Sequence, residues 1–335
     1  MCTSILCVSQ STNISGVINT YTSVSGLSDD TISVASSVGF SVGDKLLIIQ
    51  MQGATIDESN TSSFGDITSI NDAGNYEFSI ICNVLDATTI IVKGIQRTYD
   101  PSGIIQAVRV PVYNNAIITA MLTAPAWNGL TGGVLAFECT GALTMNDEIN
   151  LQGAGFRGGA VTTSTYSCAW FDNVQDYHYN IITGEGAMKG EGVALYISNK
   201  TGGRGAQANG GGGGNDHNSG GGGGANASAG GLGGERIKPS TFTCQGLSPG
   251  VGGKPNTYTN ALNKIFLGGG GGAGHENNPA TGTSGGNGGG IVIAKADTII
   301  GNGNTINVGG ASVLASSADG AGGAGAGGTI LLDEI

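Results

Sequence analysis

Two histidines stand beside carboxylates at matching places in the sequence. His217 follows Asp216, His275 precedes Glu276, and each histidine lies three residues after a run of five glycines. Imidazole and carboxylate groups in such pairs can form a weak metal site or polar contacts to a ligand. A zinc enzyme needs three protein ligands with supporting hydrogen bonds, which the sequence does not supply. We expect the pairs mainly to be polar loops where glycine-rich strands turn.

A second candidate site is a cluster of aromatic residues between positions 166 and 179. Asp, Asn and His residues are interleaved with them, and aromatic faces with planar polar groups suit sugar rings. The alternative, which we favour, is a loop whose aromatic side chains are buried by packing. The candidate ligand-binding residues in the cluster are Tyr166, Trp170, Phe171, Tyr177 and Tyr179.

No motif predicts catalysis. The stretch at 202–205 has no following helix and no Lys-Ser/Thr pair, so it does not match a phosphate-binding loop. A Gly-x-Ser-x-Gly elbow is also absent. Asp147 and Glu148 are candidates for glycoside hydrolysis, but they lie where a polar turn is expected in any case. We therefore expect no enzymatic activity, no cofactor and no metal.

Six cysteines bear on the compartment. None forms a C-x-x-C pair, and no histidine lies at metal-ligand spacing from them. An even count permits disulfides in an oxidising compartment, with fifteen connectivities open. The alternative is free thiols buried in strands. The residues are Cys2, Cys7, Cys82, Cys139, Cys168 and Cys244.

The composition excludes several classes of partner. The chain has 335 residues with 64 glycines, only 11% charged residues and a formal net charge of −11. Scattered acidic charge repels phosphate backbones, so nucleic acid is not expected as a partner. No basic cluster suits anionic lipid, and the apolar runs, such as 45–50, are too short to span a bilayer. Direct membrane insertion is therefore not expected.

The two ends of the sequence indicate a longer parent protein. Residues 1–10 lack the basic start and the long apolar stretch of a signal peptide. A surface protein would then have had its signal removed and Met1 added, or Met1 would be internal to a longer precursor. The chain also ends just after a strand begins, at Ile335. We expect one module of a longer polypeptide.

Residues 1–130 have the pattern of an antiparallel β-rich domain, either a sandwich or a barrel. Short β-branched runs alternate with turns rich in Gly, Asn, Asp and Ser. No segment keeps a helical period with caps, so almost no helix is expected. The predicted strands include 31–34, 45–50, 76–82, 88–92 and 104–110.

Residues 131–335 contain an internal repeat. A diglycine followed by a short apolar strand occurs three times, beginning at residues 132, 289 and 327. The first two copies match further at a constant offset of 157, which aligns Leu143 with Ile300 and Ile149 with Ile306. One such unit cannot bury its apolar face alone, so the units must stack. The repeat predicts a β-solenoid-like stack of strands.

A glycine-rich insert occupies about residues 202–288 of this second domain. Its five-glycine runs 210–214 and 268–272 repeat at an offset of 58. Such sequence forms either a disordered linker or packed polyproline II helices, which have three residues per turn and no internal hydrogen bonds. The strict collagen period is absent. Strands flank the tract and apolar residues such as Phe266 interrupt it, so we favour a packed polyproline II bundle.

Several motifs together resemble a family of surface proteins. They are residues 47–54 (LIIQMQGA), 74–77 (GNYE), 108–111 (VRVP), 122–134 (LTAPAWNGLTGGV), 153–159 (GAGFRGG), 189–192 (KGEG) and 289–293 (GGIVI). The series is similar to the N-terminal region of large secreted bacterial surface proteins, including Bacteroidetes gliding-motility adhesins. The glycine-rich part is also similar in composition to the polyproline II bundles of some phage tail-tip adhesins. The resemblance covers nearly the whole chain and implies secretion, surface display and adhesion, but no catalytic residues.

Three functional hypotheses follow. The first is a non-catalytic adhesin module at the bacterial cell surface that contacts surface polysaccharide or an abiotic surface. The second is a structural fibre or stalk subunit whose partners are copies of itself, downstream repeats of the same polypeptide or other surface and secretion components. The third, which we favour least, is a polysaccharide-active enzyme.

Overall fold

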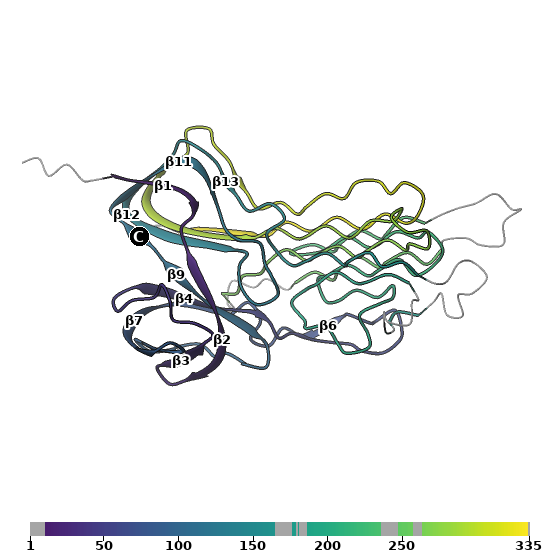
Figure 1. Ribbon diagram of the computed structural model, residues 1–335, viewed down its shortest axis with the longest axis horizontal. Helices are drawn as coiled ribbons and strands as arrows, with labels where there is room; N and C mark the ends of the chain where they lie inside the picture. Colours follow the sequence, from purple (N-terminus) through teal and green to yellow (C-terminus); the bar gives the residue numbers. More distant parts are fainter. Residues whose placement is uncertain are drawn as a thin grey trace, which may run out of the picture.

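The computed structural model describes residues 11–164, 176–178, 180, 186–235, 247–256 and 263–333. All regular elements in these ranges are β-strands, which confirms the predicted all-β class. No helix among these residues is long and apolar enough to cross a membrane. A barrel and a curled parallel sheet form one end of the molecule, and a long bundle of glycine-rich segments extends from them (Figure 1).

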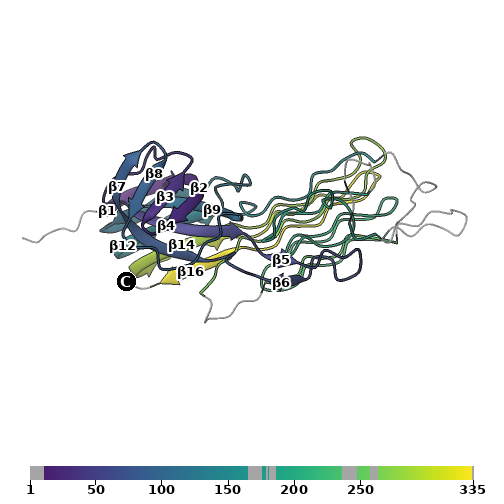
Figure 2. The ribbon, with the colours of Figure 1, turned by 90° about the horizontal axis from the view of Figure 1, so that it is seen from below.

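The barrel is closed and antiparallel, and it contains most of the strands predicted for residues 1–130. Its strands in spatial order are β2 (Thr20–Ser28), β3 (Thr31–Val34), β8 (Thr89–Val92), β7 (Tyr76–Asp86), β4 (Lys45–Gln52) and β9 (Ile104–Val110). A two-stranded ribbon of β5 (Thr55–Ile56) and β6 (Ile67–Ser69) extends from the barrel along the bundle (Figure 2).

The second sheet is parallel and curls over the barrel like half of a second barrel (Figure 1). Its main order is β15 (Ile306–Asn307), β13 (Ile149–Asn150), β11 (Asn115–Thr123), β12 (Val134–Met145), β14 (Ile291–Ile300) and β16 (Thr329–Asp333). In addition, β1 (Ser11–Val17) pairs with β11, and β10 (Val112–Tyr113) pairs with β12. Because β11 and β12 pair, the predicted boundary at residue 130 lies inside this sheet.

The internal repeat corresponds to the register of this sheet. Strands β12, β14 and β16 begin the three copies and lie side by side, with Val134 opposite Ile291 and Ile291 opposite Thr329. The offset of 157 residues is therefore a pairing register. A bulge after Cys139 shifts it by one residue, so that Leu143 pairs with Ile299 and not with Ile300. Stacked solenoid coils are not confirmed, since the strands form one curled sheet.

Strand β4 shows why an uninterrupted apolar run is a strand here. Successive side chains of a strand point to opposite faces. Leu46 and Ile48 belong to the core inside the barrel, whereas Leu47 and Ile49 pack outside it. Both faces of β4 are therefore buried, and the usual polar alternation is lost.

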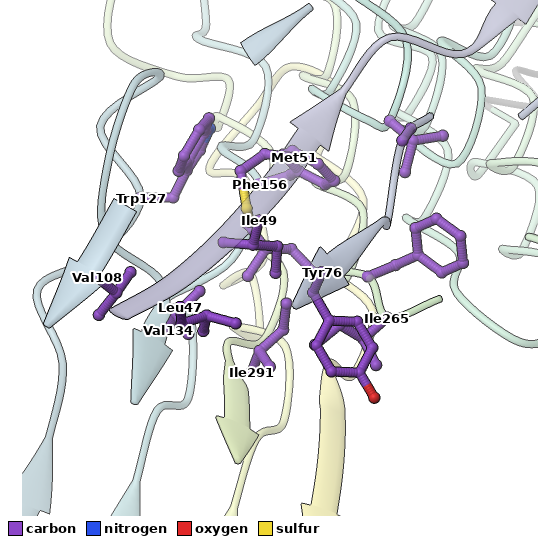
Figure 3. Packing of buried hydrophobic residues seen from close by; sticks show 14 of the residues in the cluster. Leu47, Ile49, Met51, Tyr76, Val108, Trp127, Val134, Phe156, Ile265 and Ile291 are labelled. Atoms are coloured by element: carbon purple, nitrogen blue, oxygen red, sulfur yellow. The ribbon is translucent and has the colours of Figure 1, made fainter. Parts of the chain in front are cut away.

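One hydrophobic core joins the barrel, the sheet and the bundle (Figure 3). It contains Leu47 and Ile49 from the barrel, Val134 and Ile291 from the sheet, and Phe156 from the start of the bundle, all fully buried. Fully burying each such side chain is worth about 1.5–3 kcal/mol. We call the barrel and the parallel sheet together the base. The shared core fixes where the glycine-rich segments leave this base.

The glycine bundle consists of extended segments that lie side by side along the long axis (Figures 1 and 2). They bond to one another through backbone groups rather than through regular strand ladders. The segments are 155–160, 187–193, 202–215, 219–225, 230–234, 248–254, 266–275, 283–290 and 320–328. Several of these lie outside the predicted insert 202–288, so the packed region is larger than the sequence indicated.

Residues 268–275, which we call the central run, show the rule of packing. Every third N–H group donates to the same neighbouring segment, at N···O distances of 2.8–3.1 Å. The first set of N–H groups belongs to Gly268, Gly271 and Gly274, which donate to the carbonyls of residues 289, 286 and 283. The second set belongs to Gly269, Gly272 and His275, which donate to the carbonyls of residues 225, 222 and 219. The third set belongs to Gly270 and Ala273, which donate to the carbonyls of residues 191 and 188. Three residues per turn is the period of polyproline II.

The carbonyl groups of the central run reach three further segments. Their donors are the N–H groups of residues 156 and 159, of 211 and 214, and of 320, 323 and 326. The central run therefore has six neighbours, three through its N–H groups and three through its carbonyls. The five-glycine repeats are among these contacts, because 211 and 214 bond directly to 270 and 273.

Such close packing leaves no room for side chains in the centre. A Cβ atom built on Gly272 would lie 1.9 Å from the carbonyl oxygen of Gly212. Glycine is required here by the approach of backbones and not by an unusual backbone angle.

We expect Gly272→Ala to destabilise the protein by about 1–3 kcal/mol or more, because the added methyl group must push the central run from a neighbour. Gly301→Ala is the matched control, since a Cβ there meets nothing within 4 Å. Thermal unfolding monitored by circular dichroism compares the two. Equal melting temperatures for both variants would contradict the packing described.

Candidate functional site at the distal end of the glycine bundle

The end of the glycine bundle remote from the sheet gathers turns from three parts of the sequence. His275 donates its N–H to the carbonyl of Ser219 at 3.0 Å, and Gly320 donates its N–H to the carbonyl of His275 at 2.8 Å. The Asn218 side-chain amide donates to the carbonyl of Ala318 at 2.9 Å. We call residues 215–219, 275–282 and 316–319 the distal turns.

The structure brings the two predicted histidines together in these turns. The ring centroids of His217 and His275 are 6.3 Å apart, with the planes inclined by 48°. His275 is fully buried, and its Nδ1 accepts the N–H of Asn218 at 3.1 Å. His217 is half-buried and is therefore the more accessible of the two.

The carboxylates beside the histidines bind backbone N–H groups. Asp216 accepts from the N–H of His217 at 2.7 Å and of Leu247 at 3.0 Å. Burial raises the pKa of Asp216, and these two hydrogen bonds oppose the rise. Asp216 thus stabilises the turn as an acceptor, as the interpretation of polar loops expects.

Glu276 and Asp319 have the same role in the next turns. Burial works against ionisation of Glu276, but the hydroxyl of Thr163 and the N–H groups of Thr281 and Gly282 hold its pKa below the usual value. One oxygen of Asp319 accepts the hydroxyl of Thr281 at 2.5 Å and the N–H groups of residues 277 and 278. Within the described ranges, no three His, Cys, Asp or Glu side chains converge as metal ligands.

Of the aromatic cluster, the structure describes only Tyr177. Its N–H donates to the side chain of Asn60 at 2.7 Å, and the guanidinium of Arg204 lies 5.3 Å from its ring centroid. The carbonyl of Asp176 accepts from Asn215 at 2.9 Å, so this segment borders the distal turns. The other predicted ligand-binding residues lie outside the described residues: Tyr166, Trp170, Phe171 and Tyr179.

The buried Lys189 stands in the motif 189–192, but the sequence does not indicate its role. The Nζ of Lys189 donates to the carbonyls of Tyr177 at 2.5 Å, Gly203 at 3.1 Å and Gly205 at 2.6 Å. It also lies 4.6 Å from the ring centroid of Phe64, in the loop that joins β5 to β6. Burial lowers the pKa of Lys189 well below its usual value. This one side chain ties the bundle to the segment that carries Tyr177.

A second unassigned contact lies nearer the base. Arg157 and Glu191 form a two-pronged ion pair, with N···O distances of 3.0 and 2.9 Å. Glu191 is almost completely buried. In the sequence both residues lie in motifs of the resemblance, 153–159 and 189–192, where each is a charged side chain among glycines, but nothing there indicates that they pair.

Two of the six cysteines are described, and both are free thiols. Cys82 is exposed, whereas Cys139 is buried in β12, where burial raises the pKa of its thiol to about 11. The candidates Cys2, Cys7, Cys168 and Cys244 lie outside the described residues. The free thiol of Cys139 agrees with the alternative of a cysteine buried in a strand.

Asp147 and Glu148 occupy the turn between β12 and β13. Glu148 accepts from the side chain of Asn150 at 3.1 Å, and Asp147 accepts the N–H of Glu148 at 2.7 Å. Both carboxylates thus contribute to the turn at the sheet end of the molecule, away from the distal turns.

Comparisons with known proteins identify no relative. No family model, no curated protein and no solved structure matches the chain.

We expect Lys189→Met to destabilise the protein by about 1–3 kcal/mol, because the buried carbonyl of Gly205 loses its donor. The carbonyls of Tyr177 and Gly203 keep the backbone N–H groups of Gly205 and Gly213 as donors. Lys200→Met is the control, since Lys200 pairs at 2.9 Å with the exposed Glu58, and such a pair contributes about 0–1 kcal/mol. Chemical denaturation measures both. Similar losses in the two variants would argue against the role given to Lys189.

Proposed function

We propose that the chain is an extracellular, non-catalytic binding module of adhesin type, displayed at a bacterial surface. In this proposal the glycine bundle is a packed array of polyproline II helices that acts as a rigid support. Along the central run, every third N–H group donates to the same neighbouring segment, and this period of three residues supports the assignment. The distal turns are then the contacting surface.

The observation that carries the proposal is the backbone-filled interior of the bundle. Because a Cβ on Gly272 has no space, side chains that vary in chemistry can be carried only at the outer faces and ends. The distal turns join three distant parts of the sequence, and their carboxylates fix the local backbone. Such rigid support lowers the entropy lost on binding.

The side chains at the distal turns favour neutral polar ligands. Asn278 is exposed, and Asn277 and His217 are half-buried. Amide and imidazole groups donate and accept hydrogen bonds, which suits sugar hydroxyls. The net charge of −11 disfavours polyanions. We therefore propose a surface polysaccharide as the ligand, with an abiotic polar surface as the other candidate.

One observation favours the second hypothesis, a fibre or stalk subunit. Strand β16 pairs with β14 on one side and forms the edge of the parallel sheet. Ile330 and Leu332 on this strand are 42% and 46% exposed. An open apolar edge is a template for pairing with a further strand. Filaments seen by electron microscopy and abolished by Ile330→Lys would favour this function.

For the adhesin proposal, we expect saturable binding of residues 1–335 to at least one neutral polysaccharide in a panel that also includes glass and polystyrene. The double variant His217→Ala, Asn278→Ala should bind about tenfold more weakly or worse, because each lost hydrogen bond is worth about 1 kcal/mol. Biolayer interferometry with immobilised glycans measures the affinities.

The control is Asn13→Ala, an exposed asparagine of β1 at the opposite end of the molecule. It should bind like the parent. Unchanged affinity of the double variant would show that the distal turns are not the contacting surface, and a lack of binding to every surface would remove the adhesin proposal.

A further inference from the structure

Residues 219–225, which we call the second run, have one neighbour fewer than the central run. Their N–H groups donate to three segments, and their carbonyls accept from only two. The segments reached through N–H groups are 231–234, 321–324 and 209–212, and those reached through carbonyls are 269–275 and 250–253. A sixth position beside the second run is therefore empty among the described segments.

The unused carbonyls recur with the period of the bundle. In the second run the carbonyls of 219, 222 and 225 bond to the central run, and those of 220 and 223 bond to residues 250 and 253. The remaining set is Gly221 and Gly224, three residues apart. No donor from the described part of the chain reaches either carbonyl oxygen.

The empty position is a groove on the outside of the bundle. It has a volume of about 570 Å³ and is lined by the second run and by the segments 231–234 and 321–324. These two flanking segments each bond to the second run and not to each other. In the pattern of the bundle, the place of one segment is therefore open between them.

The walls of the groove offer further hydrogen-bonding groups at the same spacing. The N–H groups of Gly231 and Gly234 on one wall, and of Ala321 and Ala324 on the other, bond to no acceptor within the described residues. In the filled part of the bundle, residues 283 and 286 stand in the place of 231 and 234, and they donate to 320 and 323. Among the described residues, the groove thus offers unpaired N–H groups on its walls and unpaired carbonyls on the second run, at a spacing that matches a strand with three residues per turn.

We propose that this groove binds one polyproline II strand from another polypeptide, with glycine at least at every third residue. The strand that occupies the corresponding place beside the central run is 320–326, where a Cβ on Gly323 would lie 2.0 Å from the carbonyl oxygen of Gly222. A guest strand meets the same close approach on its inner side. Its outer side faces solvent, as half-buried Ala321 does, and tolerates larger residues.

An extended peptide is favoured over a sugar chain as the occupant. The free groups alternate between walls with a fixed three-residue spacing, which a peptide backbone in this conformation reproduces without distortion. Strand addition through main-chain hydrogen bonds is a general mode of peptide recognition. A glycan has hydroxyl groups but no such regular alternation of N–H and carbonyl groups.

The test uses the whole chain and a synthetic 12-residue peptide of four Gly-Gly-Ala repeats, with Ser-Thr-Ala repeats as the control peptide. Isothermal titration measures affinity, and amide hydrogen exchange measures protection. We expect saturable binding of the glycine peptide alone. Exchange at Gly231, Gly234, Ala321 and Ala324 should slow at least tenfold when it binds.

Gly231 and Gly234 line the groove, and a Cβ at either position meets nothing within 4 Å. We therefore expect the double variant Gly231→Val, Gly234→Val to obstruct the groove and to keep the fold. It should weaken peptide binding at least tenfold. Gly301→Val, equally uncrowded but at a turn outside the groove, should bind like the parent.

Three results would overturn the proposal. One is peptide binding that the groove-filling variant does not weaken. Another is a neutral polysaccharide that protects the four amides when the peptide does not. The third is a dimer of the parent chain that the groove-filling variant dissociates while no peptide binds, which would make a second copy the occupant.

Discussion

The whole molecule depends on the requirement that buried peptide groups be paired. In the bundle this requirement is met without α-helices and almost without strand ladders, because segments such as the central run direct successive peptide groups to different neighbours. Neighbouring backbones must then approach to hydrogen-bonding distance on all sides. Glycine is the residue that permits this, and the composition of the chain follows from it.

The base supplies what the bundle lacks. Glycine contributes no apolar side chain, so hydrophobic stabilisation is concentrated in the core shared by barrel, sheet and bundle. Phe156 and Phe266 carry that core into the bundle, and Lys189 and Arg157 add polar ties further along. The barrel, the curled sheet and the bundle are thus one structure, in which the base sets the register of the segments and the bundle holds the distal turns.

Sequence reasoning succeeded where side chains carry the information. Apolar alternation and turn residues located the barrel strands. The 157-residue repeat identified positions that pair in the parallel sheet, such as Ile149 with Ile306, but it was interpreted as a solenoid-like stack. It failed to assign β11 to that sheet, because β11 carries no copy of the repeat. It also could not tell which glycine segments are neighbours, since glycines have no side chains to distinguish them. The histidine pair was identified from its flanking carboxylates. The residues around Lys189, in contrast, form no pattern that predicts its hydrogen bonds to three carbonyls.

The wide sequence span of the central run's neighbours bears on how the chain folds. The central run bonds to residues as early as Phe156 and as late as Ala326. Closing such long loops is slow, and each glycine loses more conformational entropy on ordering than any other residue. A growing chain can complete the barrel early but cannot close the bundle until its last segment has emerged. Closure of the bundle around the central run is therefore a late step of folding, which follows formation of the barrel.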